Sequence, residues 1–160
     1  MTTAGRSGPD ADRPRVLIIV QNLPVPFDRR VWLECQALVE AGYGVSVVCP
    51  KAPGDPTSAV LDGVELEKYR PWPPVTAKLG FLGEYLWSLA ATAWLVARVR
   101  RRHRVDVVQT CNPPDIFWPL GLACRAWGGS RFVFDQHDLC PELFESRFPE
   151  GSRLVTRACA

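Results

Sequence analysis

The sequence predicts an α/β domain with a doubly wound, mostly parallel, Rossmann-like sheet. Continuous apolar runs rich in Val and Ile recur along the chain, and such runs are typical of strands buried on both faces of a sheet. Segments with helical spacing alternate with these runs, which is the pattern of βαβ units. The chain has 160 residues, 47% of them hydrophobic and 22% charged, which fits one domain with its own core.

The first half of the predicted sheet comes from two apolar runs. Residues 1–14 are polar and contain Gly and Pro, so we expect a disordered leader there. Val16–Val20 is the first buried strand. Asp28 is placed to cap the helix that follows and Gly42 to end it, ahead of a second buried strand at Val45–Cys49.

The middle of the chain has a less regular pattern. Residues 51–62 are rich in Pro and Gly and predict a loop. In residues 64–68 apolar side chains alternate with glutamates, which predicts a less buried strand near a sheet edge. A long helical segment follows from about Ala77 to His103.

Two further strands are separated by a helix. Val105–Gln109 and Phe132–Phe134 are apolar runs of strand length. Between them, residues 115–127 have a helical pattern that begins at Asp115, a natural N-cap, and closes at Gly128–Gly129.

The last segment predicts a helical piece at residues 141–148 and a final helix capped by Ser152. That final pattern has no C-terminal cap. We therefore expect residues 15–160 to form one domain that is truncated, in a fragment of a longer reading frame.

The formal net charge of +2 argues against a general nucleic-acid-binding role. Five arginines at the end of the long helix contribute +5, so the remaining residues sum to +2 − 5 = −3. Such a run is either an ordinary solvated face or a contact with an anionic membrane surface. The five residues are Arg98, Arg100, Arg101, Arg102 and Arg104.

The six cysteines show no CxxC spacing, so the sequence carries no zinc or dithiol redox motif and we expect no metal. The polar N-terminus lacks the pattern of a signal peptide. We therefore expect reduced, mostly buried thiols in a cytoplasmic protein.

The long helix raises the question of a membrane span. Residues 79–97 carry one charge, Glu84, and nearly reach the length that crosses a bilayer. Glu84, Ser88 and Thr92 form a polar seam at helical spacing, opposite an apolar stripe that starts at Leu82. A spanning helix would put the βα units on opposite sides of the bilayer. We expect a helix packed on the domain, with peripheral contact to the inner face of the plasma membrane as the alternative to full burial.

Ligands of doubly wound folds bind beyond the carboxyl ends of the strands. Three polar loops follow predicted strands there, at residues 22–30, 110–115 and 135–142. The first loop contains neither GxGxxG nor GxxxxGK[ST], which disfavours the dehydrogenase and P-loop modes of binding a diphosphate.

Arg29 and Arg30 occupy the first turn of the first helix, where the positive end of the helix dipole disfavours cations. One interpretation is that Asp28 and Glu34 neutralise them, since Arg30 and Glu34 are four residues apart. The other is that the two arginines bind an anionic substrate or order the cleft.

The loops after the last two strands hold the remaining candidates. Asn112 has no capping role and is suited to hydrogen-bond a hydroxyl-rich ligand. His137 lies among Asp135, Asp138 and Glu142 at a strand end, where an imidazole can exchange a proton with a sugar hydroxyl near neutral pH. A structural role for this histidine is the alternative.

Three segments resemble the N-terminal domain of family 4 glycosyltransferases, which have the GT-B fold. They read DRRVWLECQALVEAGYGVSVVCP from Asp28, VDVVQTCNPPD from Val105 and FVFDQHDLCPEL from Phe132. The resemblance covers about residues 16–148. It implies retaining transfer of a sugar from a nucleotide-diphosphate-sugar donor to a lipid-linked or cell-surface glycan acceptor in polysaccharide biosynthesis, with no further cofactor.

The resemblance also implies roles for individual residues. His137 would be catalytic and face the cleft beside the transferred sugar. The substrate-binding residues would be Asn22, Asp28, Arg29, Arg30, Asn112, Asp138 and Glu142. The family's donor motif lies in a C-terminal domain that this sequence lacks, so we expect the chain to be inactive alone. The alternative function is a non-catalytic α/β half-domain that binds a glycan or a protein and acts with a separate partner chain.

Overall fold

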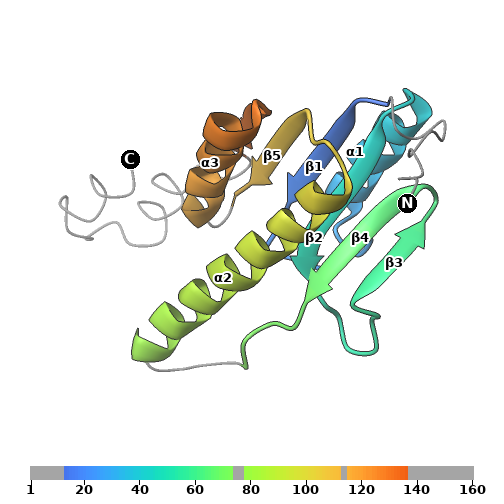
Figure 1. Ribbon diagram of the computed structural model, residues 1–160. Helices are drawn as coiled ribbons and strands as arrows, with labels where there is room; N and C mark the ends of the chain where they lie inside the picture. Colours follow the sequence, from blue (N-terminus) through green and yellow to red (C-terminus); the bar gives the residue numbers. More distant parts are fainter. Residues whose placement is uncertain (1–12, 74–77, 113–114, 137–160) are drawn as a thin grey trace, which may run out of the picture.

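The structure is a computed structural model that describes residues 13–73, 78–112 and 115–136. Helices cover both faces of a six-stranded sheet, with α1 on one face and α2 and α3 on the other (Figure 1). The elements are, in chain order, β1 (Arg15–Ile19), α1 (Arg29–Glu40), β2 (Gly44–Pro50), β3 (Ser58–Leu61), β4 (Val64–Tyr69), α2 (Lys78–Arg102), β5 (Val107–Cys111), the 3-10 helix η1 (Asp115–Phe117), α3 (Trp118–Gly128) and β6 (Arg131–Asp135).

The strand order is β3-β4-β2-β1-β5-β6, and every neighbouring pair is parallel except β3 with β4. The predicted doubly wound, mostly parallel sheet is therefore confirmed. The chain moves outward from β1 in one direction through β2 and in the other through β5. The point between β1 and β5 is thus the topological switch point, beyond which such sheets bind ligands.

The prediction of an uninterrupted loop over residues 51–62 was wrong, because β3 lies within it. This strand pairs antiparallel with β4 and forms the edge of the sheet. Its side chains are mostly exposed, so it lacks the apolar run that marked the central strands.

Residues 64–68 lie in a strand near an edge of the sheet, as predicted, but the prediction that this strand is less buried was wrong. Glu67 in β4 is only 1% exposed and Lys68 only 4% exposed. Each is compensated by an ion pair: Glu67 Oε1 lies 2.5 Å from Arg102 Nη1 on α2, and Lys68 Nζ lies 2.6 Å from Asp55 Oδ2. Pairing of this kind allows charged groups to be buried in a strand that its sequence marks as half-polar.

Two hydrophobic layers hold the sheet. Between α1 and the sheet, Val31 and Cys35 pack on alternate residues of β1 and β2. On the other face, Leu95 and Val99 of α2 and Phe117 of η1 pack on the residues of β1 and β2 that point the opposite way. The central strands are buried on both faces, which explains their continuous apolar sequences.

The helix termini follow their sequence signals with one exception. Asp28 caps α1, since its Oδ1 accepts a hydrogen bond from the Val31 amide at 3.2 Å. Gly42 and Gly129, which follow α1 and α3, adopt the positive φ angles of 87° and 67° that glycine favours. Asp115 is not the N-cap of α3, because η1 intervenes and the cap position is Phe117, with no side-chain hydrogen bond.

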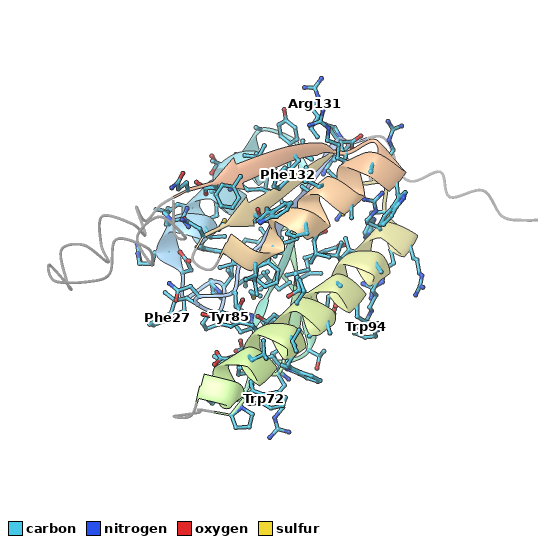
Figure 2. The ribbon with its side chains drawn as sticks, turned by 90° about the vertical axis from the view of Figure 1, so that its left-hand side faces the viewer. Phe27, Trp72, Tyr85, Trp94, Arg131 and Phe132 are labelled. Atoms are coloured by element: carbon cyan, nitrogen blue, oxygen red, sulfur yellow. The ribbon has the colours of Figure 1, made fainter. Side chains whose placement is uncertain are left out.

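The N-terminal part of α2 differs from an ordinary amphipathic surface helix, although Leu95 and Val99 in its C-terminal part are buried against the sheet. Ser88 and Thr92 are buried, whereas Leu82, Leu86 and Trp94 are 57%, 59% and 58% exposed. Figure 2 shows Trp94 projecting from the outer side of this helix. The buried hydroxyls face Tyr69, the last residue of β4, and burial raises the pKa of the Tyr69 phenol to about 12.

Within the described part of the chain, no helix combines the length and hydropathy needed to cross a membrane. The exposed face of α2 is nonetheless apolar over several turns.

Candidate functional site

The candidate site lies at the carboxyl ends of β1, β5 and β6, beside the switch point of the sheet. The loop after β1 leads into the N-terminus of α1, and Asn112 follows β5 directly. Asn22 and Arg29 are exposed, whereas Asn112 is buried. The structure therefore brings Asn22, Arg29 and Asn112 to the edge of the sheet that the sequence predicted.

Asp135, the last residue of β6, connects the three segments of this edge. Its Oδ2 atom lies 3.1 Å from Arg30 Nη1 at the start of α1 and accepts a hydrogen bond of 3.1 Å from Gln109 Nε2 of β5. Its backbone carbonyl accepts a hydrogen bond of 3.1 Å from the backbone amide of Asn112. We call Arg30, Gln109, Asn112 and Asp135 the strand-end cluster.

The partner of Arg30 differs from the sequence-based interpretation. Arg30 is neutralised by Asp135, and Glu34 instead accepts a hydrogen bond of 3.1 Å from the same Gln109 Nε2. Gln109 is buried beneath α1 and therefore needs acceptors for its amide group. The carboxylates of Glu34 and Asp135 accept its hydrogen bonds, and Arg30 forms an ion pair with the same Asp135 carboxylate.

Gln109 is a site residue that the sequence analysis missed. It stands in the run VDVVQTC, where its neighbours on both sides are apolar or buried. A glutamine in the middle of a buried parallel strand is the signal that could have found it, because such a side chain must be hydrogen-bonded.

The remaining predicted residues divide into two groups. The Asp28 carboxylate caps α1, so part of its hydrogen-bonding capacity is used within the fold. His137, Asp138 and Glu142 lie outside the described residues. The described chain ends at Gln136, and the strand-end cluster thus fixes the backbone two residues before His137.

The thiols near this edge are kept protonated. Burial, with Asp135 nearby, raises the pKa of the Cys111 thiol to about 12, and burial raises that of Cys35 to about 12 and that of Cys49 to about 11. A protonated thiol is a poor nucleophile and a poor metal ligand. Cys35, Cys49, Cys111 and Cys124 are free and buried, as predicted for reduced thiols.

Among the described residues, no three His, Cys, Asp or Glu side chains are grouped so that they could hold a metal ion.

The arginine run does not form a continuous exposed stripe. Nη1 atoms of Arg98 and Arg102 lie 3.7 and 2.5 Å from the Glu67 carboxylate. Arg100 donates to the carbonyl of Cys124 at 3.1 Å, and Arg104 Nε lies 3.2 Å from Asp106 Oδ1. Arg101 is exposed and pairs with no carboxylate of the described residues. Much of the run therefore holds α2 on the domain.

Comparison with known proteins agrees with this architecture. The model of the family described as Glycosyltransferase Family 4 matches residues 27–159. The structure is similar to that of sucrose-phosphate synthase from Thermosynechococcus elongatus, with a TM-score of 0.62 and 13% sequence identity over 89% of this chain. The match spans 37% of the length of that protein, and at this identity the likeness concerns the fold. No curated protein sequence matches the chain significantly.

Proposed function

Because the chain belongs to glycosyltransferase family 4, we propose that it is the acceptor-side half of an enzyme that moves a sugar from a nucleotide-diphosphate sugar to a lipid-linked or cell-surface glycan, with retention of the anomeric configuration. The observation that supports this most is the strand-end cluster. It joins the N-terminus of α1 to the carboxyl ends of β5 and β6, where folds of this class bind their ligands.

His137 is the proposed catalytic residue. Its imidazole would exchange a proton with a hydroxyl of the bound sugar, which is the chemistry of a group whose ordinary pKa lies near neutrality. Asp138 and Glu142 are proposed to support its loop. The cluster contributes by holding Asp135, two residues earlier, in one position against α1 and β5.

The other proposed substrate-binding residues differ in how free they are. Arg29 and Asn22 are exposed at the edge and available to phosphate or hydroxyl groups. Arg30, Asp28 and Asn112 already have partners within the fold, so a substrate would share them with Asp135, the α1 cap and the end of β6.

The exposed face of α2 is proposed to touch the inner face of the plasma membrane. Leu82, Leu86 and Trp94 form an apolar surface, and Arg101 lies on the same side of the helix at its C-terminal end. Aromatic and leucine side chains enter the lipid interface while an arginine contacts anionic headgroups. Such an enzyme would work on a lipid-linked acceptor from the cytoplasmic side.

The test is transfer itself. The protein that contains this chain is incubated with a panel of nucleotide-diphosphate sugars and a lipid extract, and radiolabelled glycolipid is quantified. We expect one donor to be used, with an anomeric configuration in the product, read by NMR, equal to that of the donor. Inversion would contradict the retaining mechanism, and no transfer from any donor would contradict the proposed function.

A further inference from the structure

A pocket of about 550 Å³ lies at the carboxyl ends of β2 and β4, away from the strand-end cluster. One wall is the loop Lys51–Asp55 after β2, and the other is the turn Arg70–Pro73 after β4. Its size is that of an ordinary small-molecule site.

The pocket carries net positive charge. Its one carboxylate, Asp55, is compensated by the buried Lys68, whose Nζ lies 2.6 Å away and holds the pKa of Asp55 below its ordinary value. Lys51 and Arg70 are the remaining charged groups of the lining. Lys51 Nζ donates to Thr57 Oγ1 at 3.4 Å and also helps to lower the pKa of Asp55, but neither cation forms an ion pair with a carboxylate of the described residues. The pocket is thus suited to an anion.

Trp72 gives the pocket an aromatic wall that is fixed in place. Its ring packs against Trp87 of α2, with 6.2 Å between the ring centroids, and approaches Gly83 closely enough for a side chain there to touch it. Trp87 Nε1 in turn donates to the carbonyl of Arg70 at 2.8 Å. Trp72 is 39% exposed and lies beside the first turns of α2 (Figure 2).

The loop opposite is also ordered before any ligand arrives. Asp55 Oδ2 accepts a hydrogen bond of 3.1 Å from the Ala52 amide, and the Asp55 amide donates back to the Ala52 carbonyl at 3.1 Å. The Lys51 amide donates to the carbonyl of Tyr69 at 2.8 Å, which ties the loop to the end of β4. Preorganised walls lower the entropic cost of binding.

The pocket and the strand-end cluster both lie at the carboxyl ends of the parallel strands. Three strand spacings separate β2 from β6, which is about 14 Å at the usual spacing of strands. An extended acceptor of two or three sugar units could therefore reach both places at once.

We propose that this pocket binds a negatively charged sugar residue of the acceptor, with its ring on Trp72 and its phosphate or carboxylate on Arg70 and Lys51. One face of a sugar ring presents C–H groups that pack on an indole plane, while a guanidinium suits either anion. Assigning this ligand to the acceptor rests on the proposed function, whereas the binding itself does not.

The test is a titration of this chain followed by the indole N–H signals in ¹H–¹⁵N NMR spectra. The Trp72→Phe variant identifies the Trp72 signal among those of the six tryptophans. The probes are glucose 1-phosphate, glucuronate, neutral glucose and inorganic phosphate. Glucose 1-phosphate and glucuronate distinguish a phosphate from a carboxylate as the preferred charge.

We expect at least one charged sugar to shift the Trp72 signal saturably with a millimolar Kd. In Arg70→Gln that Kd should rise about tenfold, since one charge-assisted hydrogen bond is lost. The matched control is Arg131→Gln, because Arg131 is exposed at the opposite end of the molecule (Figure 2) and its loss should leave the Kd unchanged.

Three results would overturn the proposal: no saturable shift with either charged sugar, an equal affinity for neutral glucose, or an equal affinity for inorganic phosphate alone. The outcome is separate from that of the transfer assay. Binding without transfer would support the pocket as a sugar-binding site and refute the proposed enzymatic function. Transfer without binding would refute the pocket proposal and leave the proposed function intact.

Discussion

Arg30 and Asp135 form an ion pair of 3.1 Å although 105 residues separate them in the chain. The pair joins the N-terminus of α1 to the carboxyl end of β6. Gln109, which lies between them on β5, donates to the same Asp135 oxygen. This arrangement gives Arg30 a structural partner and holds Asp135, which precedes His137 by two residues in the sequence, against α1 and β5.

The Arg30–Asp135 pair should couple measurably. Arg30→Gln and Asp135→Asn should each lower the free energy of unfolding by about 1 kcal/mol, a value kept small because the Arg30 side chain is 44% exposed. The double variant should lose less than the sum of the two. Urea unfolding of the three variants checks this, with Arg29→Gln, a neighbouring exposed arginine, as the matched control. Strict additivity would show that the pair contributes nothing.

Gln109 should contribute more to the free energy of unfolding than Arg30 or Asp135. Gln109→Leu leaves the carboxylates of Glu34 and Asp135 without their shared donor, so we expect a loss of about 1–3 kcal/mol in the free energy of unfolding. Gln36→Leu, on the partly exposed surface of α1, should change it by less than about 0.5 kcal/mol. Equal effects of the two substitutions would refute the role of Gln109. Thermal and urea unfolding both measure the difference.

The Asp55–Lys68 pair predicts a pH dependence of stability. Its hydrogen bond to Lys68 lowers the pKa of Asp55 from an ordinary value of 3.8. The contribution is therefore fully present above pH 3.8 and is lost as the pH falls through the lowered pKa of the folded state. We expect the Tm difference between the wild type and Asp55→Asn to be largest near neutral pH and to shrink below about pH 4. A difference that stays constant down to pH 2 would contradict this.

The exposed face of α2 should bind anionic vesicles through its apolar residues. The double variant Leu86→Ser with Trp94→Ser should bind vesicles that contain phosphatidylglycerol at least about tenfold more weakly, because two interfacial side chains are lost. Arg101→Gln should weaken binding at low salt and have little effect at high salt. Val60→Ser, which removes an exposed apolar residue from β3, is the control. Cosedimentation measures all four proteins, and unchanged binding by the double variant would exclude this face.

Replacement of all five arginines of the run would test the membrane proposal poorly. Arg98 and Arg102 compensate the buried Glu67, and loss of both would leave that carboxylate unpaired beneath α2. The five arginines look like one patch in the sequence because pairing with a residue on a distant strand leaves no trace in the local charge.

Several elements of the fold follow from local chemistry. Asp28, Gly42 and Gly129 mark helix ends through hydrogen bonding and backbone geometry that one residue determines. The buried strands β1 and β2 follow from their β-branched apolar runs. These features depend on a few adjacent residues, so a single sequence contains the information.

The wrong predictions involve contacts between distant residues. The burial of β4 depends on the ion pairs that Glu67 forms with Arg102 and Lys68 forms with Asp55. The burial of Ser88 on α2 depends on the Tyr69 hydroxyl, which its side chain faces. At the site, the sequence placed Arg30 at the correct edge but paired it with Glu34 by helical spacing. The fold instead supplies a nearer carboxylate from β6.

We propose that sugar transfer takes place beyond the strand-end cluster, with His137 as the catalytic residue. The most direct test is the kcat of His137→Ala in the protein that contains this chain, measured alongside its Tm. We expect kcat to fall by at least about 100-fold, the usual contribution of a general acid or base, with the Tm unchanged. His103→Ala alters the chain's other histidine, which lies beside Glu65 near the amino end of β4, and should leave kcat unchanged. A His137→Ala enzyme with the wild-type kcat would show that His137 is not the catalytic residue.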